Sequence, residues 1–444
     1  MKIDIPEGAL KVLTQLHKEG YEAYVVGGCV RDSIMGRCPN DWDITTSALP
    51  EEVKACFDRT IDTGIQHGTV TVRMDGESYE VTTYRIDGKY EDGRHPKEVT
   101  FTPNLEEDLK RRDFTINAMA YNPIDGLVDL YGGVNDIKTK QIRCVGDAIS
   151  RFSEDALRML RALRFSAQLD FEIEKETFLG IQRLAPTLEK ISAERIQVEL
   201  VKLVCSSHPE KMRDVYESGL SKIFFPEWDE MMECEQNSIH HCFNVGEHTI
   251  SVMEHVPAEK KMRLAALLHD VGKPLSRKTD DKGRDHFSGH PLLGSQMAKE
   301  ILQRLKFDNA TIEYVVRLVK YHDERPAATK RNVRRLMHRV GKENIDDLLV
   351  LKRGDAAGQS EYMREDKFSY IDTLETLYKE VCKEQEAVTV KELKINGKDL
   401  MDLGVEKGPK IGEILNHLLD MVIEEPSKNE KEVLIEEVRK VKSK

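Results

Sequence analysis

The sequence predicts an α+β protein, with a small mixed-sheet head at the N-terminus and an all-helical body behind it. In the first 145 residues, segments rich in β-branched and aromatic residues at 22–27, 69–73 and 79–84 alternate with helical segments and with Gly-, Asn- and Pro-containing turns. After about residue 147, apolar residues recur almost throughout at the spacing of amphipathic helices. The length of 444 residues predicts roughly two to four domains.

The helical pattern divides the chain further. We expect a head at 1–147, a helical neck at 148–225, a helical metal-binding domain at 226–370 and a helical tail at 371–444. The predicted helices of the body cover residues 153–168, 192–205, 209–219, 259–271, 291–305, 309–322, 331–340, 343–352 and 363–385.

Composition excludes several classes of protein. Hydrophobic residues make up 39% and charged residues 33%, which is too apolar for a disordered chain. No apolar run approaches the roughly 18 residues that span a membrane, and the N-terminus lacks a signal-peptide pattern, so we expect a cytoplasmic location. The eight cysteines form no CxxC pair and are expected as reduced thiols. The net charge of −12 argues mildly against nucleic-acid binding, so local basic stripes must decide.

The strongest motif is YVVGGCVRDSIMGRCPNDWDI, residues 24–44. A strand runs into Gly27-Gly28 and a helix follows, which suits a phosphate, with Arg31 as an added cation. Asp41 and Asp43 are two residues apart, so in a strand both carboxylates point to one face. Adjacent like charges are costly unless a divalent cation neutralises them, so the pair predicts a magnesium site.

A third carboxylate completes this hypothesis. Glu80, on the predicted strand 79–84, could lie beside Asp41 and Asp43; the alternative is a surface Glu on the exposed face. The order GG, R-D and DxD resembles the polymerase-beta-type nucleotidyltransferase superfamily. The resemblance implies two metal ions that activate an RNA 3′ hydroxyl and bind the triphosphate of the incoming nucleotide.

Two later segments carry residues suited to a nucleotide. In DLKRRDFTINAMAYN (108–122), a basic pair near a helix start could hold triphosphate or ribose; a solvated helix face is the alternative. In RFSEDALRMLRALRF (151–165), Ser153 is predicted to cap a helix whose face carries Asp155 and three arginines, more cations than nearby acids. This excess favours an anionic ligand over a surface ion-pair ladder. The candidate residues are Arg112, Asp113, Asn117, Asp155, Arg158, Arg161 and Arg164.

Asp155 and Arg158 also suggest base selection. Cytosine and adenine each present an amine donor beside a ring-nitrogen acceptor, whereas uracil and guanine present a carbonyl oxygen there. A carboxylate that accepts from the amine, with an arginine that donates to the ring nitrogen, would accept C and A and reject U and G.

The motifs GGCVRD, DWD, RRDFTINAMAYN and EDALRMLRALRF, in this order, resemble the class II tRNA nucleotidyltransferases: the CCA-adding enzymes and their bacterial poly(A) polymerase relatives. The resemblance covers the head and the start of the body. It implies tRNA, CTP and ATP as partners, Mg²⁺ on Asp41 and Asp43, and nucleotide contacts from Gly27, Gly28, Arg31, Arg112, Asp113 and Asn117. It also implies that Asp155 and Arg158 form an amino-acid template for the base, assisted by Arg161 and Arg164.

Two further segments resemble parts of the same family. Residues 85–97 (RIDGKYEDGRHPK) are polar and glycine-bearing, and resemble the flexible loop that family members need for adding the final A. The segment ISAERIQVEL (191–200) resembles a family motif more weakly.

The body carries a second constellation of metal-binding residue types. His269-Asp270 ends an apolar helix and is followed by GKP, and His248 and Asp355 could complete one metal site. His290 and His322 could add a second ion or bind phosphate. The order of these residues resembles the HD phosphohydrolase superfamily. It implies a divalent transition metal or Mg²⁺ and phosphomonoester or 2′,3′-cyclic phosphate hydrolysis for RNA 3′-end repair, or else a vestigial, structural body.

Basic residues in the body and tail are candidate tRNA contacts. The segment KRNVRRLMHR (330–339) carries a stripe of cations, for which a solvated helix face is the alternative. The tail turn GVEKGPKIG opens a helix and also resembles the CCA-adding family. The candidates are Lys330, Arg331, Arg334, Arg335 and Arg339 in the stripe and Lys407 and Lys410 in the tail.

Three alternatives to CCA addition remain open at this stage. The first is an enzyme that adds only the terminal A, or a bacterial poly(A) polymerase. The second is an RNA phosphohydrolase whose head only binds RNA, and the third is a non-catalytic RNA-binding protein. The intact DxD motif speaks against the second, and the two intact metal-binding constellations speak against the third.

Overall fold

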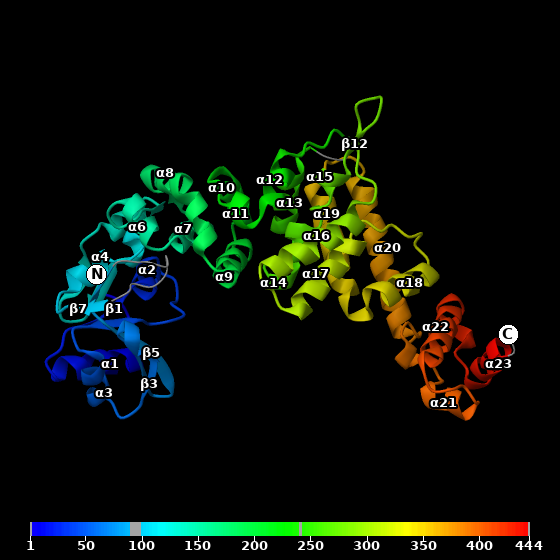
Figure 1. The fold of residues 1–444 in the computed structure, drawn as a ribbon, viewed down its shortest axis with the longest axis horizontal. Helices are drawn as coiled ribbons and strands as arrows, with labels where there is room; N and C mark the ends of the chain where they lie inside the picture. The colour runs from blue at the N-terminus through cyan, green and yellow to red at the C-terminus, as the bar shows by residue number, and fades with distance from the viewer. Residues whose placement is uncertain (1, 89–98, 239–241, 443–444) are drawn as a thin grey trace. The chain divides into compact units, whose positions relative to one another are not determined.

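The computed structural model describes residues 2–88, 99–238 and 242–442. It separates into two compact units, Met1–Pro226 and Glu227–Lys444. The first unit begins with a mixed sheet and continues as helices, and the second is helical with one short hairpin (Figure 1). The predicted fold class, a mixed-sheet head followed by a helical body, is therefore confirmed, whereas the division into four domains stays a prediction.

The sheet organises the head. In the described part of this unit it has seven strands in the order β3-β4-β5-β2-β1-β8-β9. β2 pairs with β5 in parallel, and the other neighbours are antiparallel. The predicted strands at 22–27, 69–73 and 79–84 correspond to β1, β4 and β5. The strands are β1 (Ala23–Val26), β2 (Ile44–Thr46), β3 (Thr60–Gly64), β4 (Thr69–Met74), β5 (Glu77–Thr83), β8 (Met119–Asn122) and β9 (Gly126–Asp129).

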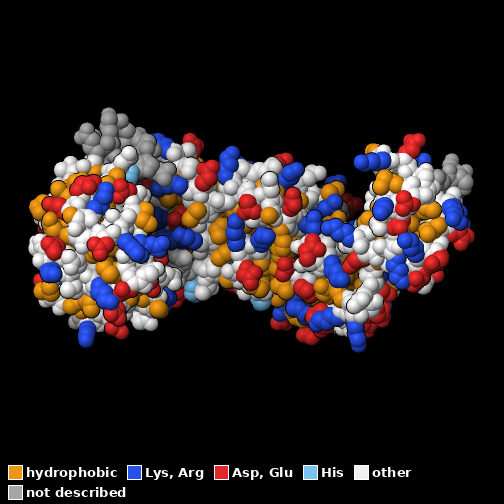
Figure 2. Space-filling view, turned by 90° about the horizontal axis from the view of Figure 1, so that it is seen from below, with side chains coloured by type: hydrophobic (Ala, Val, Ile, Leu, Met, Phe, Trp, Pro, Cys, Tyr) orange, Lys and Arg blue, Asp and Glu red, His pale blue; other side chains and the backbone are white. Residues whose placement is uncertain are grey.

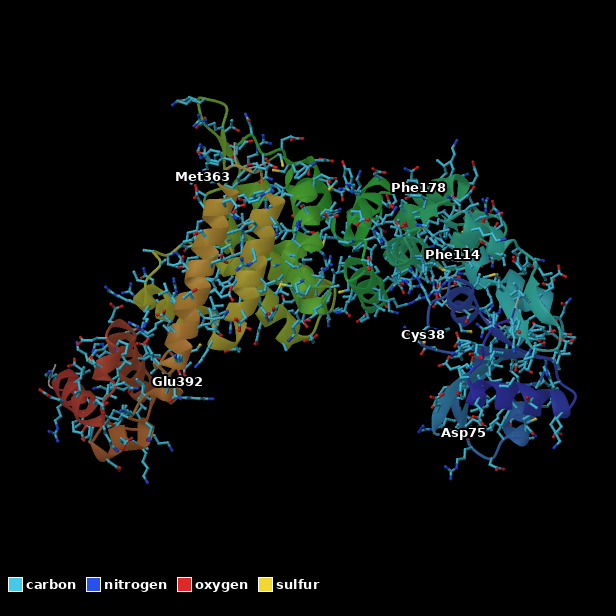
Figure 3. All side chains as sticks on the ribbon, turned by 180° about the vertical axis from the view of Figure 1, so that it is seen from behind. Cys38, Asp75, Phe114, Phe178, Met363 and Glu392 are labelled. Atoms are coloured by element: carbon cyan, nitrogen blue, oxygen red, sulfur yellow. The ribbon has the colours of Figure 1, made fainter. Side chains whose placement is uncertain are left out.

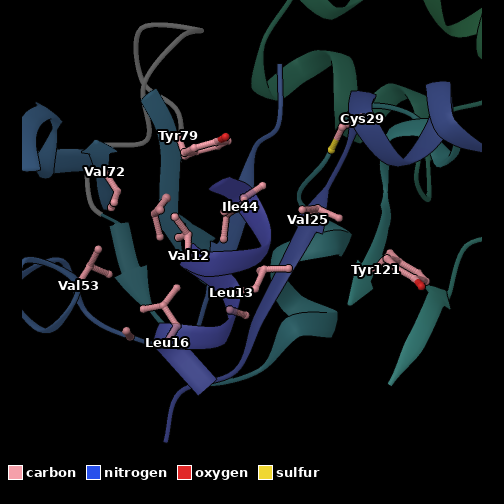
Figure 4. Close-up of a cluster of buried hydrophobic side chains, with 14 of the residues drawn as sticks. Val12, Leu13, Leu16, Val25, Cys29, Ile44, Val53, Val72, Tyr79 and Tyr121 are labelled. Atoms are coloured by element: carbon pink, nitrogen blue, oxygen red, sulfur yellow. The ribbon is translucent and has the colours of Figure 1, made fainter. Parts of the chain in front are cut away.

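The main core of the head lies between one face of this sheet and two helices, α1 (Glu7–Lys18) and α3 (Pro50–Cys56). Val12, Leu13 and Leu16 are spaced to share one face of α1, and they are at most 1% exposed. They pack against sheet residues such as Val25 and Ile44 (Figure 4). This packing holds β5, which carries Glu80, and β2, which directly follows Asp41 and Asp43.

Shorter elements complete the first unit. They are α2 (Gly28–Ile34), β6 (Arg85–Asp87), β7 (Val99–Phe101), α4 (Leu105–Lys110), η2 (Thr115–Asn117), α5 (Gly133–Lys138), β10 (Gln141–Ile142), α6 (Ala148–Glu154), α7 (Leu157–Leu169), β11 (Glu172–Ile173), α8 (Lys175–Leu184), α9 (Ala193–Val204), α10 (Met212–Glu217) and α11 (Ser221–Phe224), with α12 (Pro226–Glu233) at the unit boundary.

The single helix predicted at 153–168 is wrong. The chain forms α6 and α7 instead, with Asp155 in extended conformation between them (φ −143°, ψ 106°). Ser153 lies inside α6 and donates to the carbonyl of Ile149 at 2.7 Å, so it is not the helix cap. The helical periodicity of the sequence continues across the break, which is why the pattern did not reveal it.

The second unit is a helical bundle with a tail. Apolar residues of α18, α19 and α20 form one buried cluster, and those of α21, α22 and α23 form another. None of the described helices is both long enough and apolar enough to cross a bilayer. The elements are α13 (Val245–Glu254), α14 (Lys260–Leu268), α15 (Lys273–Ser276), β12 (Lys278–Thr279), β13 (Asp285–His286), α16 (His290–Arg304), α17 (Asn309–Tyr321), α18 (Lys330–Val340), α19 (Ile345–Gly358), α20 (Arg364–Lys383), α21 (Gly397–Asp402), α22 (Pro409–Glu424) and α23 (Lys431–Lys442).

One carboxylate of α10 makes the stability of the first unit depend on pH. Burial raises the pKa of Asp214 to about 6, and Glu172 and Glu217 add to the effect against Lys211. The unfolded value is about 3.9, so the folded state holds this proton more tightly between these pH values. The resulting stability is present at low pH and is lost as the pH rises through about 6.

We therefore expect Asp214→Asn to raise the melting temperature at pH 8, because it removes an ionised carboxylate that is partly buried. The gain should shrink as the pH is lowered to 5, where the folded wild type is already protonated. Thermal melts at both pH values test this, with Asp58→Asn, an exposed site of the same unit, as the control. An equal gain at both pH values would contradict the assignment.

Candidate functional site

The double-glycine turn lies beside a cationic side chain. Gly27 has φ +83°, which favours glycine, and a Cβ at this position would lie 3.2 Å from Nη1 of Arg112. The amide of Gly27 donates to the carbonyl of Met119, and the amide of Val26 donates to the carbonyl of Asp43. The turn is thus tied to β8 on one side and to the acidic segment on the other.

The predicted carboxylates gather at this turn. Asp41 and Asp43 lie in the segment immediately before β2, not within a strand as expected. Because Ile44 pairs with Val81 across the parallel strands, the preceding residues Asp43 and Glu80 are neighbours. The negative charges of Asp41 and Glu80 both act on the carboxyl group of Asp43.

The pKa of Asp43 is raised. Partial desolvation by the surrounding protein atoms is the main cause, although the residue is exposed at the surface, and the charges of Glu80 and Asp41 add to it. Arg112 opposes the shift. A cluster of acids that destabilise one another, with hard oxygen donors, fits a Mg²⁺ site.

A chain of polar contacts runs from the turn into the helical neck. Nη1 of Arg31 donates to Oδ1 of Asn117 at 2.7 Å, and Nδ2 of Asn117 donates to Oδ1 of Asp113 at 3.2 Å. Nε of Arg161 donates to Oδ2 of Asp113 at 2.8 Å. Burial disfavours the ionised form of Asp113, but Arg161 outweighs it and holds the pKa of this carboxyl well below its usual value. The structure thus brings these four predicted residues together.

One aromatic ring lies at the centre of the arginines. The guanidinium carbons of Arg31, Arg161 and Arg164 lie 5.2, 5.4 and 4.0 Å from the ring centre of Phe165. Such cation–ring contacts orient the guanidinium planes. Phe165 also packs edge-to-face on Phe114 at 5.8 Å. The sequence analysis assigned no role to Phe165.

Arg158, Arg161 and Arg164 each have an acidic partner, whereas the sequence predicted more cations than nearby acids on this face. Arg158 pairs with Glu154, and Arg161 pairs with Asp113. Arg164 pairs with Glu199 at 2.7 Å, although the atoms are not aligned for a hydrogen bond. The partners were missed because two of them lie far away in the sequence.

Asp155 is held by a residue that the motif analysis did not single out. Its Oδ2 accepts from Nη2 of Arg195 at 2.8 Å, and its Oδ1 accepts from the amide of Leu157 at 3.0 Å. Arg158, one turn further along, donates to the carbonyls of Arg151 and Arg111. The backbone amide of Arg158 donates to the carbonyl of Asp155 at 3.0 Å, while the side chain of each residue is held by partners of its own. The segment ISAERIQVEL, which contains Arg195 and Glu199, was the available signal.

In the second unit, the predicted histidines and aspartates form one buried cluster. The ring nitrogens Nδ1 of His248, His269, His290 and His322 lie 2.7–3.1 Å from the carbonyl oxygens of Gly358, Ala266, Phe287 and Val319. A neutral imidazole that donates through Nδ1 keeps a lone pair on Nε2. Backbone carbonyls that accept from Nδ1 orient metal-binding histidines in this way, with Nε2 toward the ion.

Asp270 lies between two pairs of these histidines. Its Oδ2 is 3.4 Å from Nε2 of His248 and 3.1 Å from that of His269. Its Oδ1 is 3.3 Å from Nε2 of His290 and 3.5 Å from that of His322. Two groups with ligand atoms within 4.8 Å of one another, each suited to a metal ion, share this carboxylate.

The cluster fits divalent metal ions. Oδ1 of Asp270 is buried without a hydrogen-bond partner among the described atoms, which is costly unless a cation compensates. Oδ1 of Asp355 lies 3.0 Å from Nε2 of His248 and extends the first group. Burial lowers the pKa of His322 and so favours its neutral, ligating form. Imidazole and carboxylate ligands are shared by several divalent metals.

Three arginines of the basic stripe on α18 contact the tail of the same unit instead of facing only solvent. Arg331 and Arg335 both pair with Glu424 of α22. Arg334 is 5% exposed and donates to the carbonyl of Ile423 at 2.7 Å and to Glu386 at 2.8 Å. The prediction that Arg334 contacts RNA is wrong, because its guanidinium is buried against the tail. On the face shown in Figure 2, basic and acidic side chains are intermixed over the helices.

Other predicted RNA contacts remain on the surface. Lys330 pairs with Glu384 at 2.7 Å and Arg339 pairs with Glu324. Lys407 and Lys410 are exposed, on either side of the start of α22. The predicted loop at 85–97 lies mostly outside the described residues.

We expect Arg334→Ala to destabilise the second unit by about 3 kcal/mol, because the largely buried carboxylate of Glu386 and the carbonyl of Ile423 both lose their partner. Arg335→Ala is the matched control, since its exposed pair should contribute less than about 1 kcal/mol. Urea unfolding of both variants measures the difference. Equal, small effects would show that Arg334 does not hold the tail.

Comparison with known proteins agrees with this geometry. The family profile described as "Poly A polymerase head domain" matches residues 23–143. The profile "Probable RNA and SrmB- binding site of polymerase A" matches 170–232, and "tRNA nucleotidyltransferase domain 2 putative" matches 292–438. The fold and these matches define a nucleotidyltransferase with a poly(A) polymerase-type head.

The relatives narrow the family. The CCA-adding enzyme of Levilactobacillus brevis is 35% identical over 97% of this chain and 96% of that protein, and that of Ligilactobacillus salivarius is 35% identical over 98% and 96%. The chain belongs to the CCA-adding enzyme family. The CCA-adding enzyme of Leuconostoc mesenteroides is 55% identical over 45% of this chain, and the match spans about half the length of that relative, 50%.

Solved structures share the fold. The Bacillus stearothermophilus CCA-adding enzyme in complex with CTP is 30% identical, with a TM-score of 0.73 over 98% of this chain and 97% of that one. The Thermotoga maritima CCA-adding enzyme complexed with tRNA has a TM-score of 0.57 over 99% of this chain and 100% of that one, at 22% identity, and supports the fold alone.

Proposed function

We propose that this protein adds C, C and A to the 3′ end of tRNA, using CTP and ATP, by nucleotidyl transfer at the Asp41, Asp43 and Glu80 cluster. The observation that supports it most is the position of Asp43, between two further acids and beside the glycine turn that Arg112 approaches. The relatives whose full length matches are named for the same reaction.

The reaction joins two substrates without a covalent protein intermediate. The 3′ hydroxyl oxygen of the RNA attacks the α-phosphorus of the nucleotide, the bond to the bridging β-phosphate oxygen breaks, and pyrophosphate leaves while the hydroxyl proton is released. Bound Mg²⁺ would activate the hydroxyl and neutralise the triphosphate. The three carboxylates would hold the metal ions, and Arg112 would face the phosphates. Arg31, fixed by Asn117, would position the nucleotide.

Base selection is assigned to Asp155 and Arg158. Asp155 would accept from the exocyclic amine of C or A, and Arg158 would donate to the adjacent ring nitrogen. The hydrogen bonds of Asp155 to Arg195 and Leu157 support this role, because a carboxylate of fixed orientation discriminates better than a mobile one. We place Arg195 as a positioning residue for Asp155.

Asp155→Asn is expected to reduce the preference for CTP and ATP over UTP and GTP by about 10-fold or more. The amide presents donors where a carboxylate presents only acceptors, and one such paired contact is worth about 1–3 kcal/mol. Single-nucleotide incorporation with each of the four triphosphates measures the ratio. A variant whose activity falls equally for all four would contradict base reading by Asp155.

Three tRNA substrates test the overall proposal: one that lacks CCA, one that lacks its last two nucleotides and one that lacks only the final A. Labelled CTP should enter the first two and labelled ATP should complete all three. Incorporation of A alone, or of long A tracts without C, would instead support the A-adding enzyme or the poly(A) polymerase.

We also propose that the tail, with exposed Lys407 and Lys410, contacts tRNA. The cytoplasmic location stays a prediction.

We further propose that the buried histidine–aspartate cluster is an HD-type metal site that hydrolyses phosphate esters at RNA 3′ ends. The carboxylate of Asp270 supports this most directly, because one oxygen faces each of two histidine pairs. Bound divalent ions would supply a nucleophilic hydroxide and polarise the phosphoryl oxygens. Lys273, whose Nζ lies 2.7 Å from Oδ2 of Asp270, lines the adjoining cavity and would face the phosphate.

A further inference from the structure

Asp108, in α4, is a buried carboxylate beside the candidate active site, and no step of the proposed reaction uses it. Its side chain is 0% exposed. An ionised carboxylate at this depth is costly unless opposite charges and hydrogen bonds compensate for the lost water. The partners of Asp108 therefore indicate what this residue contributes to the protein.

The carboxylate of Asp108 accepts four hydrogen bonds. Nε and Nη2 of Arg111 donate to Oδ1 at 2.9 and 2.8 Å. Nη2 of Arg112 donates to Oδ2 at 3.3 Å, and Oγ1 of Thr45 donates to the same oxygen at 3.1 Å. Burial disfavours the ionised form, but the charges of Arg111 and Arg112 outweigh it and hold the pKa of Asp108 below its usual value. One acid is thus shared by two arginines.

These contacts join two parts of the candidate active site. Thr45 lies in β2, two residues after Asp43. On the other side, Nη1 of Arg112 is the atom that a Cβ at Gly27 would approach to 3.2 Å. Nε of Arg112 is buried without a partner, so within the described part of the chain the contact with Asp108 is the only hydrogen bond of this guanidinium. Asp108 therefore determines where the guanidinium points.

The backbone around Arg112 is held by other contacts. The amide of Arg112 donates to the carbonyl of Leu109 at 3.2 Å. Leu109 and Phe114 are both 0% exposed, and Figure 3 labels Phe114 among the elements of the first unit. A change confined to the carboxylate of Asp108 should therefore release the guanidinium of Arg112 while the backbone keeps its own anchors.

We propose that Asp108 is a positioning residue that directs the guanidinium of Arg112 toward the triphosphate of the incoming nucleotide. This inference rests on the proposed nucleotidyl-transfer function of the head. The single negative charge of Asp108 offsets one of the two arginines, which leaves one positive charge for the phosphates. Without that charge, the adjacent guanidinium groups would repel each other, and Arg112 would lose its fixed orientation before the nucleotide binds.

Asp108→Asn in the full-length protein tests the inference. An amide has one oxygen and no charge, so it cannot serve both arginines. The KM for CTP and for ATP should rise about 10-fold or more, while kcat falls less than threefold, because a binding contact to the phosphates is weakened. An unchanged KM in a folded variant would overturn the inference.

Asp136→Asn is the matched control. Asp136 is a second buried carboxylate of the same unit, 3% exposed. It accepts from Oγ1 of Thr115 at 2.7 Å and from Nε of Arg143 at 3.2 Å, so it has the same kinds of partner. Its loss should lower the melting temperature by a similar amount while the KM for CTP stays within twofold of wild type.

Two inhibitors separate positioning from a general loosening of the site. The inhibition constant of inorganic tripolyphosphate against CTP should rise about 10-fold or more in Asp108→Asn, because this inhibitor depends on the phosphate contacts alone. The inhibition constant of cytidine, which has no phosphate, should change less than twofold. Equal losses for both inhibitors would overturn the inference.

A double-mutant cycle shows whether Asp108 acts through Arg112. The KM of the double variant Asp108→Asn/Arg112→Ala should lie within twofold of that of Arg112→Ala alone. If the two losses multiply, Asp108 acts elsewhere and the inference is wrong. If Asp108→Asn does not fold, Thr45→Val replaces it, because this variant removes one donor to Oδ2 and should raise the KM about threefold through the freed carboxylate.

A binding measurement keeps this inference separate from the proposed function. If the wild type adds no nucleotide to any of the three tRNAs, the proposed function fails. Calorimetry with α,β-methylene-CTP and Mg²⁺ then still tests Asp108, whose change to Asn should weaken binding about 10-fold or more, against less than twofold for Asp136→Asn. Equal affinity of Asp108→Asn and wild type would overturn the positioning role, whether or not the protein adds nucleotides.

Discussion

Asp43→Ala is expected to lower nucleotide addition by about 10³-fold while the protein stays folded. The side chain is the one on which Asp41, Glu80 and Arg112 all act electrostatically, so its removal should eliminate the shared metal-binding point. Losing a preorganised electrostatic stabiliser of the transition state costs about 10²–10³-fold in rate. The incorporation of labelled CTP into tRNA lacking CCA, across a Mg²⁺ titration, measures the loss.

The control separates chemistry from folding. Asp58→Asn, an exposed acid of the same unit, should retain wild-type activity. The melting temperature of Asp43→Ala should not fall and could rise, because like charges no longer oppose one another in the apo protein. Activity within tenfold of wild type, at saturating Mg²⁺, would refute a catalytic role for this carboxylate.

Asp270→Asn is expected to remove metal from both histidine groups at once and to abolish phosphate-ester hydrolysis, while nucleotide addition stays within twofold of wild type. The reason is geometric: Oδ2 faces His248 and His269, whereas Oδ1 faces His290 and His322. An amide offers one oxygen and no charge, so one substitution disables both groups. Elemental analysis of the purified protein measures the bound metal directly.

Two comparisons sharpen this experiment. His322→Gln should reduce metal content only in the second group, because His322 faces Oδ1 alone. Asp281→Asn, on the exposed hairpin, should change neither metal content nor activity. If Asp270→Asn retained a full complement of metal, Asp270 would not be the shared ligand. If it lost nucleotide addition as well, the two activities would not be separable.

The sequence predicts that Asp41, Asp43 and Glu80 lie close together, because the signal for this cluster is local. The alternation of side chains in β5 places Glu80 on a defined face of the sheet. Asp41 and Asp43 lie near Glu80 even though they precede β2 instead of lying within a strand. The histidine–aspartate cluster is also predicted correctly as a set. Histidine and aspartate are uncommon on the apolar faces of helices, so the residue types alone indicate the members of the cluster.

The contacts that were missed are those that depend on chain segments far apart. Arg195 reaches Asp155 and Glu199 reaches Arg164 across the helical neck, and periodicity carries no information on such pairs. The break between α6 and α7 was missed because Asp155 interrupts a pattern that remains helical on both sides. Arg334 looked like a surface cation because its partners Glu386 and Ile423 belong to later segments.

The arginines around Phe165 have a consequence for how an anion enters the head. Because Arg161 and Arg164 already hold carboxylates, any anion that binds to them would have to displace or share those partners instead of meeting bare positive charge. The net electrostatic gain is then the difference between the contact of each arginine with the anion and its existing contact with a carboxylate. Selectivity can rest on shape and hydrogen-bond pattern, while indiscriminate attraction of polyanions by this surface is kept weak.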